Sequence, residues 1–207
     1  HLKCRFVFAG VSAHSGYPHL GRNAIEPAAV AVTALADLRR ELEAERPPSA
    51  ELFPEVPYVA LNVALIAGGA AINIVPDRCA LDVGLRALPG MNRSALTERV
   101  HQAVRRVLPE ADFEFMVTGD SPPFLLDPEA SIHQHVCAAV GQTGSTSVSF
   151  TTDAGWLQTV GFDCVVMGPG SIEVAHRPDE FIPMSEFHRA SHLLDGLVQR
   201  LCHEPSP

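Results

Sequence analysis

Apolar side chains in the first 118 residues follow two different periods. Residues 2–9 alternate polar with apolar side chains, which is the period of a half-buried strand. From Ile25 to Leu42 the apolar residues recur at steps of three and four, as on one face of a helix of about five turns or more. Asn23 is the predicted N-cap of this helix, and Pro47 is expected to end it. The chain therefore opens with a strand and an amphipathic helix.

The same patterns predict three more strands and one more helix. Residues 58–66 form an apolar strand, and residues 79–86 alternate with a clear inner face. A helical stripe runs from Leu96 to Val107, and a last strand covers residues 113–117. The order strand, helix, strand, strand, helix, strand is that of the ferredoxin-like fold. Two helices on one side of this sheet would leave its other face or an edge for a partner.

A second domain is predicted from residue 119 onward. Residues 119–124 contain two prolines and are typical of a boundary, so we expect domains at 1–118 and 119–207. Helices and strands alternate after the boundary, which indicates an α/β domain with a parallel sheet. The predicted elements are helices at 128–140 and 185–201, a short helix ending at Val160, and strands at 145–149 and 164–167. Two or three strands cannot cover their own sheet, so this part needs the rest of a domain.

Composition excludes several classes of function. Of the 207 residues 46% are hydrophobic, as in a folded chain, and no apolar run approaches the eighteen or so residues of a membrane helix. The net charge of −9 argues against a nucleic-acid partner, because phosphate binding depends on clustered lysine and arginine. The five cysteines include no Cys-x-x-Cys pair, which indicates free thiols of a reducing cytoplasm. Cys79 and Cys164 lie in apolar segments that are predicted to be strands.

One motif concentrates the candidate chemistry. Residues 168–181 are Gly-Pro-Gly-Ser-Ile-Glu-Val-Ala-His-Arg-Pro-Asp-Glu-Phe, directly after the predicted strand at 164–167. A loop at the carboxyl end of a buried strand is where open α/β sheets bind ligands. The imidazole is the commonest protein ligand for zinc, so His176 is a candidate metal ligand. The alternative is a histidine that packs and hydrogen-bonds in a loop.

This motif resembles the C-terminal signature of the acetylornithine deacetylases. They belong to the zinc-dependent aminoacylase and exopeptidase (M20) family, with succinyl-diaminopimelate desuccinylase and the glutamate carboxypeptidases. The resemblance covers essentially all of the chain. It implies that the ferredoxin-like unit is a dimerisation domain inserted into a metal-dependent catalytic domain. This chain would then be the insert plus the returning C-terminal portion, about half of an enzyme.

The resemblance also implies a metal site that His176 completes. The family binds two zinc ions, with cobalt or manganese as alternatives, and its other ligands and general-base glutamate would lie in the portion outside this chain. The sequence itself offers no His-x-Asp pair that could hold zinc. Such a site would activate a water for attack on an amide carbonyl.

Further roles follow from the resemblance. His14, in Ala-His-Ser-Gly, matches a histidine that reaches into the active site of the other subunit to stabilise the oxyanion, and His19 in the same loop is the alternative. Asn73 matches an asparagine that donates toward the substrate; otherwise it is a turn residue that bonds its own backbone. Arg86 matches an arginine for the substrate's α-carboxylate; otherwise it pairs with Asp82 on the same face.

These residues predict a homodimeric hydrolase of the amide bond in a small N-acyl amino acid, with Gly168 and Gly170 offering backbone N–H groups to the substrate. Ornithine as the amine is less well supported, because the chain around Asn73 and Asp153 carries forms common across the wider family. The alternatives are a dipeptidase or carboxypeptidase, a succinyl-diaminopimelate desuccinylase-like hydrolase, and a non-catalytic dimerisation module.

Overall fold

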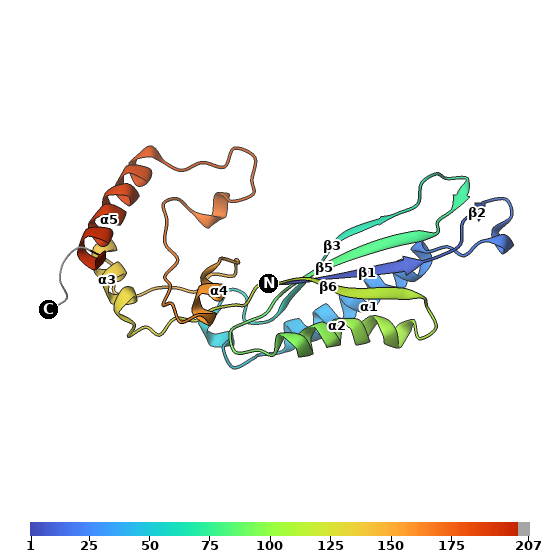
Figure 1. The fold of residues 1–207 in the computed structure, drawn as a ribbon, viewed down its shortest axis with the longest axis horizontal. Coiled ribbons are helices and arrows are strands. Elements are labelled where there is room, and N and C mark those ends of the chain that lie inside the picture. The colour runs from blue at the N-terminus through green and yellow to red at the C-terminus, as the bar shows by residue number, and fades with distance from the viewer. Residues whose placement is uncertain (203–207) are drawn as a thin grey trace. The chain divides into compact units, whose positions relative to one another are not determined.

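The computed structural model describes residues 1–202, which form two compact parts. The first part consists of residues 1–123 together with residues 147–152. The second consists of residues 124–146 and the residues from 153 onward. Figure 1 shows the elements of both parts, coloured along the chain. No helix within residues 1–202 is long and apolar enough to cross a membrane.

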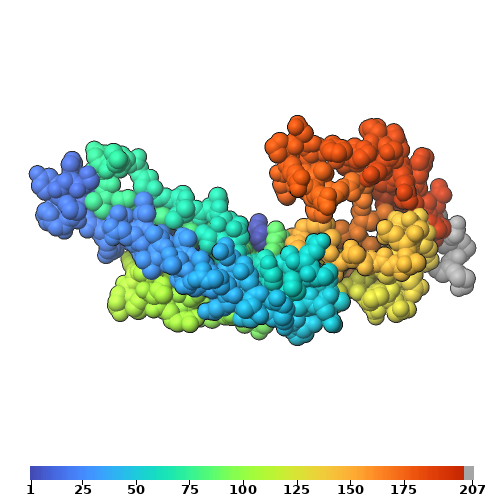
Figure 2. Space-filling model, turned by 180° about the vertical axis from the view of Figure 1, so that it is seen from behind, coloured from blue at the N-terminus to red at the C-terminus, as the bar shows by residue number. Residues whose placement is uncertain are grey.

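The first part is built on a four-stranded antiparallel sheet. Its strands are β1 (Leu2–Ala9), β3 (Ala60–Gly68), β5 (Arg78–Arg86) and β6 (Phe113–Asp120), in the order β3-β5-β1-β6. Helices α1 (Ile25–Ala44) and α2 (Arg93–Val107) lie side by side on one face of this sheet (Figure 1). The space-filling view from behind shows the outer surface of the blue α1 next to the green α2 (Figure 2). This order of elements confirms the predicted ferredoxin-like arrangement.

Every second residue of β1 points into the core between the sheet and the helices. Phe6 and Phe8 are fully buried, and the centroid of the Phe6 ring lies 4.9 Å from that of Phe115 on β6. Leu35 and Leu38 of α1 are buried in the same core. Each such side chain contributes about 1.5–3 kcal/mol through burial. The predicted inner faces of the strands and of α1 are thus confirmed.

The cysteines divide between the two parts. Cys4 and Cys79 are buried in strands of the sheet, and burial raises the pKa of Cys4 to about 11 and also raises that of Cys79. This confirms the prediction for Cys79. The prediction for Cys164 is wrong, because this residue lies outside any strand and is half-buried.

The helix ends follow the local polar residues. The N-cap of α1 is Ala24 and not Asn23, but the side-chain oxygen of Asn23 still accepts the N–H of Ile25 at 2.9 Å. The N-cap of α2 is Asn92, whose side chain accepts the N–H of Ala95 at 3.0 Å. Both contacts satisfy backbone donors that the first turn of a helix leaves unpaired. α1 ends at Ala44, ahead of the prolines that were expected to stop it.

A second, two-stranded sheet was not predicted. Strands β2 (Ala13–His14) and β4 (Ile74–Val75) pair antiparallel, with His14 opposite Ile74. The short 3₁₀ helices η1 (Pro18–Leu20) and η2 (Ala50–Leu52) complete the first part. Strands of two residues are too short to show a period in the sequence. Their pairing joins two loops at the end of the main sheet where β1 finishes and β5 begins (Figure 1).

The second part is helical within the described residues. Its elements are α3 (Ser131–Val140), α4 (Ala154–Thr159), the 3₁₀ helix η3 (Ile172–Val174) and α5 (Met184–Cys202). The helices are confirmed, but the predicted strands at 145–149 and 164–167 are wrong: no residue from 121 to 202 lies in a strand. A strand exists only when a neighbour accepts and donates its backbone hydrogen bonds. Residues 1–202 supply no such neighbour to these two segments.

Large apolar side chains of the second part remain exposed. Phe162 is 60% exposed and Phe181 61% exposed, and α5 exposes Phe187, Leu194 and Val198 to about the same extent. Exposed large apolar side chains in such number are typical of residues that another segment covers. The exposed side chains of the second part therefore have the composition of a core.

Candidate active site

The two-stranded sheet of β2 and β4 brings His14 and Asn73 together. The N–H of Ser15 donates to the carbonyl oxygen of Asn73 at 2.9 Å, immediately beyond the pairing of His14 with Ile74. The side chains of His14 and Asn73 are both exposed. Two segments that are distant in the sequence thus present one imidazole and one amide at the same tip of the domain.

The ring of His14 is held by the turn that follows it. Its Nδ1 accepts the backbone N–H of Gly16 at 3.0 Å, and the N–H of Tyr17 donates to the His14 carbonyl at 2.8 Å. The Tyr17 ring lies beside the imidazole, with 5.9 Å between the ring centroids. Within residues 1–202 the Nε2 atom of His14 has no hydrogen-bond partner. The imidazole is therefore oriented and still has one nitrogen free to act.

His19 is held less firmly. It lies in η1, and its ring contacts the edge of the Tyr17 ring at a centroid distance of 6.3 Å. The part of the chain that the structure describes offers its side chain no hydrogen bond. Of the two histidines in this loop, His14 is the one that the local structure orients, which favours it over His19.

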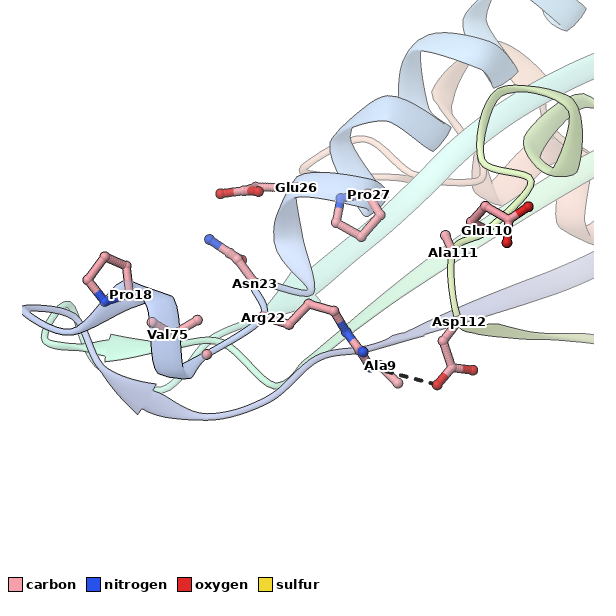
Figure 3. Close-up of a pocket in the computed structure, with 11 residues that line it drawn as sticks. Ala9, Pro18, Arg22, Asn23, Glu26, Pro27, Val75, Glu110, Ala111 and Asp112 are labelled. Carbon is pink, nitrogen blue, oxygen red and sulfur yellow. Dashed lines mark ion pairs between the residues drawn. The ribbon is translucent and has the colours of Figure 1, made fainter.

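Two open clefts flank the two-stranded sheet of β2 and β4. One, of about 510 Å³, is lined by the start of α1, by β4 and by residues 110–112, and contains the ion pair of Arg22 with Asp112 at 3.8 Å (Figure 3). Glu26 and Glu110 also line it, so its charge is mainly negative. The other, of about 470 Å³, is lined by the 68–76 loop and by Ser15. Its lining includes residues that directly neighbour His14 and Asn73 in the sequence.

Arg86 lies at the opposite end of the sheet. It is the last residue of β5, whereas β4 of the two-stranded sheet comes shortly before Arg78, the first residue of β5. Eight steps of about 3.3 Å place these two ends about 26 Å apart. The structure therefore brings His14 and Asn73 together and separates both from Arg86.

The contacts of Arg86 differ from the alternative pairing with Asp82. Its Nη1 donates to the hydroxyl of Thr151. Asp82 instead pairs with Arg5, whose Nε and Nη2 lie 2.6 and 2.8 Å from the two carboxylate oxygens. The alternative is wrong because Arg5, directly opposite Asp82 on the neighbouring strand β1, already occupies that carboxylate. Arg86 thus has no carboxylate partner within residues 1–202.

His176 has an unusual backbone. Its φ is 61°, and Asp179 has a φ of 63°; within residues 1–202 these are the two non-glycine residues with positive φ. The backbone N–H of His176 donates to the Glu180 carboxylate at 3.3 Å, which closes the loop. A left-handed residue other than glycine costs about 1–3 kcal/mol, and such residues cluster at functional sites. The ring of His176 is exposed and has no hydrogen-bond partner in the described chain.

The glycines of the motif differ in what they can offer. The N–H of Gly170 donates to the Glu186 carboxylate of α5 at 2.8 Å, so a substrate would have to displace that carboxylate. The N–H of Gly168 has no such partner within residues 1–202. The substrate-binding role expected of both glycines stays a prediction.

The described residues do not form a complete metal centre. No group of three or more His, Cys, Asp or Glu side chains within residues 1–202 could hold a metal ion. A tight zinc site takes three or four protein ligands. His176 by itself could supply only one such ligand.

Comparison with known proteins shows the family. The sequence profile of the M20 peptidase dimerisation domain matches residues 1–112, more than half of the chain. Acetylornithine deacetylases from Proteus mirabilis and Edwardsiella ictaluri are 31% and 32% identical to it, over 98% of the chain and 52% of each relative. The chain belongs to the M20 family and is an acetylornithine deacetylase-like member of it. It spans about half the length of the curated relatives that it matches.

Solved structures support the fold. A tripeptidase from Staphylococcus aureus superposes with a TM-score of 0.68 at 18% identity, over 98% of this chain and 52% of that one. A di-peptidase from Saccharomyces cerevisiae superposes with a TM-score of 0.73 at 12% identity, over 99% of this chain and 55% of that one. Both likenesses show that the chain has the fold of the corresponding half of these peptidases.

Sequence analysis missed two residues of this site. Gly16 lies in the same loop as His14, but the contact of its N–H with the His14 ring depends on the turn geometry. Glu180 was part of the quoted motif, but its contact with the His176 backbone depends on the positive φ of His176. Their positions two and four residues after the candidate histidines are the only signal that the sequence holds for these contacts.

Proposed function

We propose that the chain is part of a zinc-dependent amidohydrolase that hydrolyses the amide bond of a small N-acyl amino acid. Residues 1–118 form its dimerisation domain, and residues 119–207 are the C-terminal portion of its catalytic domain. The relatives' names and the shared family support amide hydrolysis. The five free cysteines favour a reducing cytoplasm as its location.

The observation that carries the proposal is the separation of His14 from Arg86: His14 lies beyond one end of β5 and Arg86 at the other, and these two ends are about 26 Å apart by strand rise. An N-acyl amino acid spans about three residues' length, or roughly 10 Å. One substrate therefore cannot contact both residues of the same chain. We infer that an active site takes His14 and Asn73 from one subunit of a homodimer and Arg86 and His176 from the other.

Each residue then has a chemical task. The guanidinium of Arg86 binds the α-carboxylate of the substrate in a bidentate pair, with the Thr151 hydroxyl holding one of its nitrogens. The free Nε2 of His14 donates to the oxygen that becomes negative as the amide carbonyl is attacked. The amide of Asn73 donates toward the acyl group. His176 would be one ligand of a metal ion, which when bound would supply an activated water.

Zinc, with cobalt or manganese as alternatives, fits this donor set only in the complete protein. Within residues 1–202 the candidate ligand is His176, and its exposed ring suits a site that closes when the remaining ligands are added. The exposed apolar surface of the second part supports the same view, because the rest of a catalytic domain would cover it.

A dipeptidase is the second candidate. The carboxylate at the C-terminus of a dipeptide offers Arg86 the same bidentate partner as an N-acyl amino acid does. An assay on both classes of substrate decides between an acyl group and an amino-acyl group.

The test uses the complete protein that carries this chain, loaded with zinc. It is assayed on N-acetylated amino acids including N-acetylornithine, on N-succinyl-diaminopimelate and on dipeptides. Release of acetate from N-acetyl amino acids at rates well above those for dipeptides is the expected result. Preference for dipeptides would select the second candidate. A well-folded, metal-loaded dimer that cleaves none of these would leave only the non-catalytic module.

A further inference from the structure

We infer that the backbone N–H of Gly16 fixes the tautomer of His14, so that the ring proton sits on Nε2 and points away from the turn. This inference deepens the proposed function, on which the catalytic use of that proton rests. Gly16 is thereby a positioning residue: it acts on the substrate only through His14. Residues 14–17 all lie in the first part of the structure.

A neutral imidazole has one nitrogen that donates and one that accepts. The Gly16 N–H can only donate, and it lies 3.0 Å from Nδ1 of His14. Nδ1 must therefore offer its lone pair, and the proton must be on Nε2. The opposite tautomer would place two N–H groups against each other and would lose a hydrogen bond worth about 0.5–1.5 kcal/mol. That difference corresponds to a preference of about two- to twelve-fold for the Nε2-protonated ring.

The turn around Gly16 is fixed from both sides. The Tyr17 N–H donates to the His14 carbonyl at 2.8 Å, which closes a four-residue turn. The Ser15 N–H donates to the Asn73 carbonyl at 2.9 Å, which ties the turn to the opposite loop. The direction of the Gly16 N–H is therefore determined by the backbone and does not depend on a mobile side chain.

The imidazole also lies close against residue 16. A Cβ atom at this position would be 3.1 Å from Nδ1 and 3.3 Å from Cε1 of His14. Both distances are shorter than ordinary van der Waals contacts, so a side chain here would push the ring away from the N–H by a few tenths of an ångström. Glycine at position 16 allows the ring to approach closely enough to accept the hydrogen bond.

The tautomer matters because an oxyanion needs a donor. With the proton on Nε2, the free nitrogen of His14 can donate to a developing negative charge. With the proton on Nδ1, the same position would present a lone pair and repel that charge. Loss of one oxyanion donor typically lowers kcat by about 10²–10³-fold. His19, which accepts no backbone N–H within residues 1–202, has no comparable device.

The experiment measures the tautomer directly on the 207-residue chain. The chain is labelled with ¹⁵N-histidine, and two-bond ¹H–¹⁵N correlations are recorded above pH 8. Among the ten histidines, the signal of His14 is identified by its loss in His14→Gln. The expected pattern is that of a ring protonated on Nε2 with an unprotonated, hydrogen-bonded Nδ1. An Nδ1-protonated ring, or equal populations of the two tautomers, would overturn the inference.

Two variants at position 16 separate the donor from the space. Gly16→Pro removes the N–H, and the His14 signal should move toward a mixture of tautomers. Gly16→Ala keeps the N–H and should retain the Nε2 tautomer with a weakened hydrogen bond. An unchanged His14 signal in Gly16→Pro would also count against the inference. If the proline variant does not fold, the wild-type spectrum alone decides.

Activity of the complete enzyme distinguishes this inference from the proposed function. The amide nitrogen of glutamine can replace an Nε2 donor, whereas that of asparagine can replace only an Nδ1 donor. His14→Gln should therefore keep at least ten times more kcat than His14→Asn, with little difference in KM. An Nε2-protonated His14 whose substitution leaves kcat unchanged would sink the catalytic role and leave the tautomer assignment standing. Equal losses in both variants, with an Nδ1-protonated ring, would sink the tautomer assignment alone.

Discussion

His14 and Arg86 lie at opposite ends of one antiparallel sheet, on the loop that follows β1 and on the last residue of β5. The antiparallel pairing of these strands, Ala9 with Arg78 and Leu2 with Leu85, makes this separation a property of the sheet itself. No side-chain rotation can bring the two residues to one small substrate. A site that used both residues would therefore have to take them from two subunits.

A mixed-dimer experiment tests whether the site is shared. In the complete enzyme, His14→Ala and His176→Ala homodimers should both be nearly inactive. Unfolded and refolded together in equal amounts, they should give about half heterodimers, each with one site that has both residues intact and one that has neither. About a quarter of wild-type activity should return.

The control for this experiment is the heterodimer itself, counted by native mass spectrometry. If His14 acts within its own chain, every heterodimer site lacks one residue, and the mixture stays inactive. That result, with heterodimers present, would rule out the shared site.

Arg86 is tested with an altered substrate. Arg86→Ala in the complete enzyme should cost about 2–4 kcal/mol in kcat/KM, because it removes one side of a charge pair with the α-carboxylate. An amidated substrate should be poor for the wild type and should lose little further on the variant. Arg5→Ala is the matched control, since Arg5 lies on the same sheet but pairs with Asp82. Equal sensitivity of wild type and Arg86→Ala to amidation would assign Arg86 a structural role with Thr151.

Metal content tests the incompleteness of the site. Zinc added to the 207-residue chain and then dialysed should remain at well below one ion per chain, because one histidine ligand does not hold zinc tightly. The same chain should show no amidase activity. Metal analysis by mass spectrometry gives the ratio of zinc to protein. Stoichiometric zinc together with activity would show that the 207-residue chain forms a site by itself.

Acid should weaken the contact between α1 and α2. Arg99 lies 2.7 and 2.9 Å from the two carboxylate oxygens of Glu45 and holds the pKa of that carboxyl below its ordinary value of 4.5. A group whose pKa is lower in the folded state stabilises the fold above its unfolded pKa. The contribution is lost as the pH falls below about 4.5 and through the folded pKa. Because the pair is partly exposed, it contributes no more than about 0.5 kcal/mol.

Urea denaturation at pH 7 and pH 3 measures this contribution. Glu45→Gln should unfold at a lower urea concentration than the wild type at pH 7, and the two should converge at pH 3. Glu51→Gln is the control, because this exposed glutamate has no hydrogen bond or ion pair within residues 1–202. A difference between Glu45→Gln and wild type that persists at pH 3 would contradict an electrostatic origin.

The sequence by itself was sufficient for the four-stranded sheet and the two long helices of the first part and for the family. Alternation along β1 and the helical stripe of α1 depend on local burial, so the pattern of apolar positions alone assigns Phe6, Phe8 and Leu35 to the core. The motif around His176 was recognisable because its residues are consecutive in the chain. The same local signals failed at 145–149 and 164–167, because within residues 1–202 these segments lack the neighbouring strands that would pair with them.

Only the tertiary structure could decide which residues meet. Strand register decides three relationships: the pairing of His14 with Ile74, the separation of Arg86 from the two-stranded sheet, and the pairing of Asp82 with Arg5. Register joins residues that are distant in the chain, and no period or propensity encodes it locally. The contact of Gly16 with His14 is local in sequence, yet it needs the backbone of the turn to aim one N–H at one nitrogen.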